Sequence, residues 1–64
     1  MVNPVPRRVV DSVFQAMFSL TDLRVLLRAT APAHELDPDQ RSEAERLIRD
    51  LEQQVIILKE ELIR

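Results

Sequence analysis

The residues best suited to chemistry are gathered in one short stretch of this 64-residue chain. His34 is the only histidine, and it lies beside Glu35 and close in sequence to Asp37 and Asp39. An imidazole next to carboxylates could act as a general base for a serine nucleophile, or it could bind a metal ion together with Glu35 and Asp37. Both activities need further groups that orient the imidazole.

The rest of the sequence does not supply those groups. The three serines, Ser12, Ser19 and Ser42, fall in stretches that should be helical, and the chain has no glycine with which to build an oxyanion-hole turn. There is also no cysteine, so a metal at His34 would have only carboxylates as further ligands. We therefore expect no enzymatic activity, no catalytic residue, no metal and no cofactor, and we interpret His34 as a solvated loop residue.

The length of the chain limits how it can be stabilised. Below roughly 70 residues a single core seldom suffices without disulfides, a metal or a second subunit. Without cysteine, the expected solution is association with a second copy of the chain. No apolar run approaches the roughly 18 residues of a membrane span, and residues 55–58 form the longest clear run. We expect a cytoplasmic protein without membrane contact.

Prolines divide the chain into two expected helices within a single domain, residues 1–64. The first helix should span about 6–30, because Pro6 suits a helix start and Pro32 disfavours helical angles in the residue before it. A loop should follow over 31–37. The sequence Asp37-Pro38-Asp39-Gln40 has the pattern of an N-cap, a proline at the first helical position and a capping amide, which predicts a second helix over about 38–63. A short connection between helices of equal length predicts an all-α antiparallel hairpin.

The first helix has an apolar surface wider than one partner helix would cover. At 100° per residue, one stripe is expected to face the second helix, while Ser12 and Ser19 fall on the opposite side. The residues of this stripe are Val9, Val13, Ala16, Met17, Leu20, Leu23 and Leu27. Ser19 to Asp22 has the spacing of a second capping box, but the hydrophobic phase runs through it without a shift, so a continuous helix is favoured.

The second helix carries a heptad pattern that predicts a dimer seam. Its apolar positions are Ala44, Ile48, Leu51, Val55, Leu58 and Leu62. Together with a second strip on the first helix, they predict that two hairpins dimerise into a four-helix bundle. The residues expected at this oligomer interface are Phe14, Phe18, Val25, Ile48, Leu51, Val55, Leu58 and Leu62.

Three isoleucines lie outside the heptad pattern. Ile56 and Ile63 extend the apolar surface around the C-terminal turns, and Ile57 is expected among charged residues on the outer side of the helix. We interpret Ile56, Ile57 and Ile63 as a surface that binds another protein.

The layout resembles the Rop-like helical hairpins, which form small dimeric four-helix bundles. The resemblance covers the chain length, the two antiparallel helices and the acidic turn Glu35-Leu36-Asp37-Pro38-Asp39-Gln40. It implies the bundle architecture and assigns no role to any residue.

Charge helps to rank two functional classes. Residues 1–34 carry four arginines and two acids, whereas residues 35–64 carry nine acids and five bases, so the two halves attract each other when they lie side by side. With a net charge of −2, we expect first a regulatory adaptor or assembly subunit that acts through protein contacts, as a homodimer. The alternative is a dimeric bundle that binds RNA or DNA through Arg7, Arg8, Arg24 and Arg28. A helix-turn-helix DNA reader is less favoured, because its turn has only three or four residues.

Overall fold

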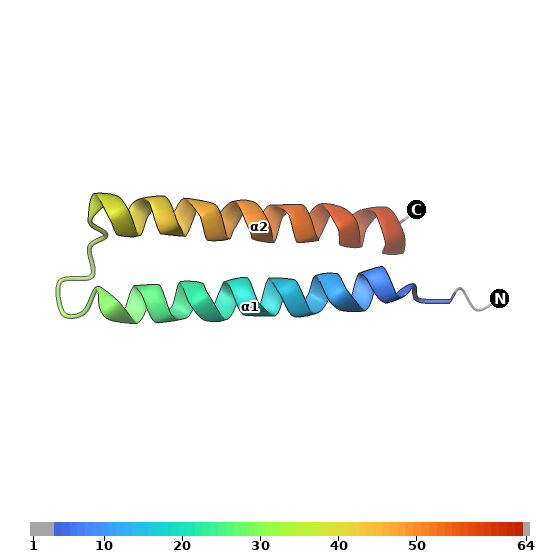
Figure 1. Cartoon of the computed structure of the whole chain (residues 1–64), viewed down its shortest axis with the longest axis horizontal. Coiled ribbons are helices and arrows are strands. Elements are labelled where there is room, and N and C mark those ends of the chain that lie inside the picture. The colour runs from blue at the N-terminus through green and yellow to red at the C-terminus, as the bar shows by residue number, and fades with distance from the viewer. Residues whose placement is uncertain (1–3, 64) are drawn as a thin grey trace.

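The computed structural model describes residues 4–63 and shows two antiparallel helices joined by one loop (Figure 1). Helix α1 spans Arg7–Ala29 and helix α2 spans Pro38–Leu62. Both described chain ends lie at one end of the hairpin and the loop lies at the other. The described part measures 52 × 15 × 14 Å. The expected all-helical hairpin is therefore confirmed.

Local rules explain where each helix begins and ends. Pro6 is extended and precedes the first turn of α1, and the hydroxyl of Thr30 closes its last turn by donating to the carbonyl oxygen of Leu27 at 2.6 Å. At the start of α2, an Asp37 carboxylate oxygen accepts from the backbone N–H of Gln40 at 2.8 Å, and the Gln40 side chain accepts in return from the N–H of Asp37 at 3.0 Å. This capping box confirms the predicted start of α2.

The loop reverses the chain between the two helices. His34 adopts a left-handed backbone conformation with φ of 57°, a region in which non-glycine residues are uncommon. Its backbone N–H donates to the carbonyl oxygen of Thr30 at 2.8 Å. The Ala31–Pro32 peptide bond is cis. α1 itself runs without interruption past Ser19, as the unbroken hydrophobic phase predicts.

The side of α1 that faces α2 differs from the expected one. The buried and half-buried positions repeat at alternating intervals of three and four residues, and they include both serines that were expected on the outside. Ser12 is 3% exposed and Ser19 is 5% exposed. We call this row the α1 seam; it consists of Val9, Ser12, Ala16, Ser19, Leu23 and Leu26. The predicted stripe is therefore off-centre, because Val13, Met17, Leu20 and Leu27 are exposed in the single hairpin.

The matching row on α2 also mixes apolar and polar residues. Its best-buried members are Leu47, which is 2% exposed, and Ala44. We call this row the α2 seam; it consists of Ala44, Leu47, Leu51, Gln54, Leu58 and Glu61. Small side chains on both seams let two helix backbones approach closely, which accounts for the burial of serine between them.

Ile57 also differs from the expectation. It is half-buried, whereas the heptad pattern placed it on the outer, charged side of the helix. The reason is that the face of α2 that contacts α1 is also rotated away from the centre of the heptad pattern. It is rotated towards Asp50 and Ile57, which are therefore half-buried beside the α2 seam. Only the neighbouring helix can cover Ile57 in this hairpin.

Candidate interaction surface

The residues considered for chemistry are not brought together. Ser12 and Ser19 are buried between the helices, and the Ser19 hydroxyl donates to the Asp50 carboxylate, so neither serine is presented to a substrate. Within residues 4–63, no hydrogen bond joins the His34 side chain to a serine. The same part of the chain holds no group of three or more His, Cys, Asp or Glu side chains placed to bind a metal ion.

Charged residues of both helices share one long side of the hairpin, which we call the polar face. Near the chain ends, Arg8 Nη1 donates to Glu61 Oε1 at 3.0 Å, and Arg8 Nη2 lies 3.9 Å from Glu60 Oε2. Closer to the loop, the pKa of Arg46 on α2 is raised chiefly by its hydrogen bond with Glu43, and the charge of Asp22 on α1 adds to this effect. The Arg8 contacts join an arginine of the first half to acids of the second half, as the unequal charge of the two halves predicts.

An ion pair within α2 also lies on the polar face. Arg46 Nε donates to Glu43 Oε2 at 3.2 Å. This hydrogen bond and the charge of Arg46 lower the pKa of the Glu43 carboxyl, and the same contact raises the pKa of Arg46. Both side chains are well hydrated, so the pair marks the solvent-facing side of the hairpin rather than a reactive centre.

The opposite side of the hairpin is apolar on both helices. Viewed along each helix from its N-terminus, the polar-face residues all lie on the same flank of the seam. Because the helices are antiparallel, the residues on the other flank of each seam lie together on the opposite long side of the hairpin. We call that side the apolar face. It consists of Val13, Met17, Leu20 and Leu27 on α1 and of Ile48, Val55 and Leu62 on α2, all between 41% and 55% exposed.

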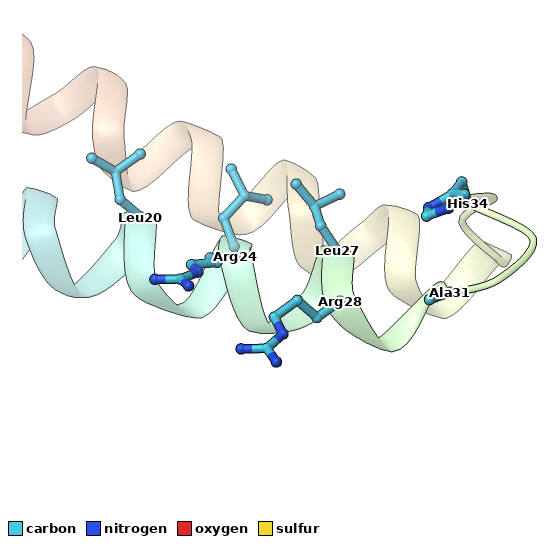
Figure 2. Close-up of a pocket in the computed structure, with 7 residues that line it drawn as sticks. Leu20, Arg24, Leu27, Arg28, Ala31 and His34 are labelled. Atoms are coloured by element: carbon cyan, nitrogen blue, oxygen red, sulfur yellow. The ribbon is translucent and has the colours of Figure 1, made fainter.

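Two open grooves mark this face. The larger has a volume of about 680 Å³ and runs along the loop end of α1, where Leu20, Leu23 and Leu27 form its apolar part. Figure 2 shows Leu20 and Leu27 extending to one side of α1 and the guanidinium groups of Arg24 and Arg28, one helical turn apart, extending together to the other side, with His34 at the loop end. The smaller groove, of about 340 Å³, lies on α2. Its lining residues are Ile48, Leu51, Glu52, Val55 and Ile56.

The residues expected at the oligomer interface fall into two groups. Ile48, Val55 and Leu62 lie on the apolar face, and Leu51 and Leu58 are half-buried members of the α2 seam beside this face. The other group is Phe14, Phe18 and Val25, which we call the aromatic edge. At 100° per residue, the aromatic edge points away from α2 rather than along the apolar face. Phe18 is 61% exposed there.

The residues expected to bind another protein are also separated. Ile56 and Ile63 lie on the outer side of α2, and Ile63 is 78% exposed. We call these two residues the isoleucine edge. Ile57 is not part of it, because it is half-buried towards α1.

Sequence reasoning did not assign the α1 half of the apolar face to an interface with a second copy. Val13, Leu20 and Leu27 repeat every seven residues, and Val10, Met17 and Arg24 do the same three residues earlier. Such a pattern is a second heptad beside the one that faces α2. Two adjacent heptads on one helix were the available signal, because each heptad provides the contact surface for one neighbouring helix.

Neither helix in the described part of the chain is long and apolar enough to cross a membrane. Comparison with protein-family models found no matching family, and the searches of curated proteins and of solved structures found no match either.

Proposed function

We propose that this chain is a non-catalytic protein–protein interaction module, a regulatory adaptor or assembly subunit that acts in the cytoplasm as a homodimeric four-helix bundle. The observation that supports this proposal is the apolar face. Within the described residues, the buried apolar side chains of the single hairpin are only Val9, Ala44 and Leu47. Large apolar side chains on one side of both helices are typical of an interface, and a chain this small needs a larger core.

The proposed dimer interface is the apolar face together with the half-buried residues beside it. Ile48, Val55 and Leu62 would meet the second copy, and Leu51 and Leu58 would become fully enclosed between the two hairpins. Complete burial of a fully exposed large apolar side chain is worth about 1.5 to 3 kcal/mol, and Ile48, Val55 and Leu62, each about half exposed in the single hairpin, would each contribute about half of that to the assembly. Because Ile48, Val55 and Leu62 repeat every seven residues, they can form a continuous line of contact along the bundle.

The two edges are the surfaces through which the bundle would bind another protein. The aromatic edge and the isoleucine edge both point away from the hairpin's own seams. Ile56 also lines the smaller groove on the apolar face, whereas Ile63 and the aromatic edge would stay accessible in a dimer formed through that face. Exposed aromatic and aliphatic side chains at helical spacing are the usual anchors of helix-mediated recognition. Phe14, Phe18 and Val25 on one edge, and Ile56 and Ile63 on the other, are the proposed contact residues; Ile57 would act only by supporting its neighbours.

Sedimentation and thermal unfolding test the proposed dimer. Since dimerisation is linked to folding, the thermal midpoint should rise with protein concentration. Val55→Glu should shift the protein to monomers or unfold it, because a carboxylate on the apolar face cannot be buried without a partner. Gln53→Glu is the matched control on the outer, polar part of α2, and it should leave the dimer intact. A stable folded monomer of the unaltered chain at micromolar concentration contradicts the proposal.

One observation supports nucleic-acid binding as a second candidate. Arg24 and Arg28 are exposed side by side, and within residues 4–63 neither forms an ion pair. Two copies would carry four such arginines. Binding to an RNA or DNA duplex through phosphate contacts should weaken steeply as salt rises, whereas apolar protein contacts should not. Titration of labelled duplexes at low and high salt, with Arg24→Gln as the variant, distinguishes the two candidates.

A further inference from the structure

We propose that the second copy docks on the apolar face with its loop at the same end of the bundle, so that Arg24 of each chain pairs with Glu45 of the other. This inference rests on the proposed homodimer and specifies its arrangement. It is carried by the register of the hairpin and by the distribution of charge beside the apolar face.

Two face-to-face arrangements satisfy two-fold symmetry. If the axis runs along the helices, the two loops lie at the same end, and α1 of each copy packs on α2 of the other. If the axis runs across the helices, the loops lie at opposite ends, and α1 packs on α1 while α2 packs on α2. Both arrangements bury the same patch on each copy, as an isologous interface requires. Apolar area alone therefore does not distinguish them.

The first arrangement has a register that the single hairpin already fixes. Rotation about an axis along the helices leaves the height of every residue unchanged, so α1 meets the second copy's α2 in the register it has with its own α2. Two contacts define that register, Arg8 with Glu61 and Ser19 with Asp50. From the first contact to the second, the chain advances eleven residues along α1 and goes back eleven residues along α2, so the two helices stay in step. Five residues beyond Ser19, Arg24 is level with Glu45.

Arg24 is the residue for which this register matters, because it needs an opposite charge at its own height in the dimer. It occupies a position between Leu20 and Leu27 beside the larger groove, where the row of α1 is otherwise apolar. A second copy on this face removes water from the guanidinium group, and a charge deprived of water needs an opposite charge nearby. Glu45 supplies it when the loops lie together. In the same register Arg28, one turn further along α1, is level with Arg41 and lies one helical turn from the same carboxylate.

The second arrangement offers Arg24 no such partner. It brings α1 against α1, and the acidic residues of α1 are only Asp11 and Asp22. At 100° per residue both lie away from the apolar face. Charge complementarity therefore favours loops at the same end.

A distance between the two loops tests the arrangement directly. The chain contains no cysteine, so Ala33→Cys in the exposed loop provides one spin-label site per copy. With the loops together, pulsed electron paramagnetic resonance should give an inter-label distance below about 30 Å, and with the loops at opposite ends of helices about 35 Å long it should exceed about 40 Å. The long distance in a sedimenting dimer overturns this inference and leaves the proposed function standing. A monomer overturns both.

Charge reversal provides the second test. Arg24→Glu and Glu45→Arg should each weaken dimerisation by about tenfold or more at low salt, because each places like charges together in the interface. The double variant restores an opposite pair, and its dimerisation constant should return to within about threefold of the unaltered chain. Asp22→Arg is the matched control on the polar face and should leave dimerisation unchanged. A double variant weaker than both single variants overturns the proposed pairing.

Discussion

Ser19 and Asp50 join the two helices near the middle of the hairpin, where the Ser19 hydroxyl donates a hydrogen bond to the Asp50 carboxylate. Ser19 is buried and Asp50 is half-buried, so this polar contact belongs to the seam rather than to the surface. Gln54 Nε2 donates to the other oxygen of the same carboxylate at 3.4 Å. A seam of small and apolar side chains can slide by one turn, whereas a hydrogen bond between two defined groups is satisfied in one register only. The pair therefore selects the register in which Arg24 of α1 is level with Glu45 of α2.

Removing the Ser19 hydroxyl should destabilise the protein measurably. Ser19→Ala leaves the half-buried Asp50 carboxylate without that donor, and a lost hydrogen bond to a charged group costs about 1.5 to 3 kcal/mol. Urea unfolding at one fixed protein concentration measures the change. Thr21→Ala is the control, since this exposed hydroxyl donates only to the Met17 carbonyl oxygen at 2.9 Å, and its loss should cost less than about 0.5 kcal/mol. Equal effects of the two variants contradict a structural role for the seam hydrogen bond.

Enlarging a small seam residue should be as harmful as removing a polar one. Ala44 is 7% exposed and lies where α2 meets α1, so Ala44→Leu inserts a larger side chain into a closed space. Overpacking of this kind costs about 1 to 3 kcal/mol. The same replacement at the exposed Ala29 should change the free energy of unfolding by less than about 0.5 kcal/mol. If Ala44→Leu stabilises the protein instead, the helices are not held at the close distance that the seam implies.

The helix limits could be predicted because they depend on neighbouring residues. Asp37, Pro38 and Gln40 specify the start of α2 through a cap that forms within four residues, whatever the tertiary structure. Each observed helix begins or ends within one residue of the expected limits. Helix caps of this kind can be predicted from a single sequence, because all the residues that form them are close together in the chain.

The facing sides of the helices could not be predicted, because they depend on competition between two interfaces. Apolar periodicity locates the centre of all apolar side chains on α1, and that centre lies between the seam and the apolar face. Periodicity therefore predicted that Leu20 is in the core and that Ser19 is on the outside, whereas in the structure Ser19 is buried and Leu20 is exposed. The deciding factor is the hydrogen bond between Ser19 and Asp50, which lies 31 residues away in sequence and carries no periodic signal.

The Glu43–Arg46 pair predicts a specific pH dependence. Arg46 lowers the pKa of the Glu43 carboxyl, chiefly by donating a hydrogen bond to its ionised form. A carboxyl whose pKa is lower in the folded state stabilises the fold above its unfolded pKa, and that contribution disappears as the pH falls through the folded pKa. Carbon NMR titration should therefore show Glu43 ionising at a lower pH than an ordinary glutamate. Arg46→Gln should raise the Glu43 pKa towards the ordinary value, while Arg49→Gln should leave it unchanged. A Glu43 titration that does not respond to Arg46→Gln contradicts the pairing.

Ile57 and Ile63 should respond in opposite ways to the same substitution. Ile57 is half-buried towards α1, so Ile57→Glu places a carboxylate against the neighbouring helix and should cost more than about 1 kcal/mol. Ile63 is 78% exposed beyond the last turn of α2, and Ile63→Glu should change the free energy of unfolding by less than about 0.5 kcal/mol. Urea unfolding of the two variants at matched concentration makes the comparison. If both variants unfold at the same urea concentration as the unaltered chain, Ile57 does not contribute to the hairpin interface, and the heptad-based placement of this residue on the outer side of α2 is correct after all.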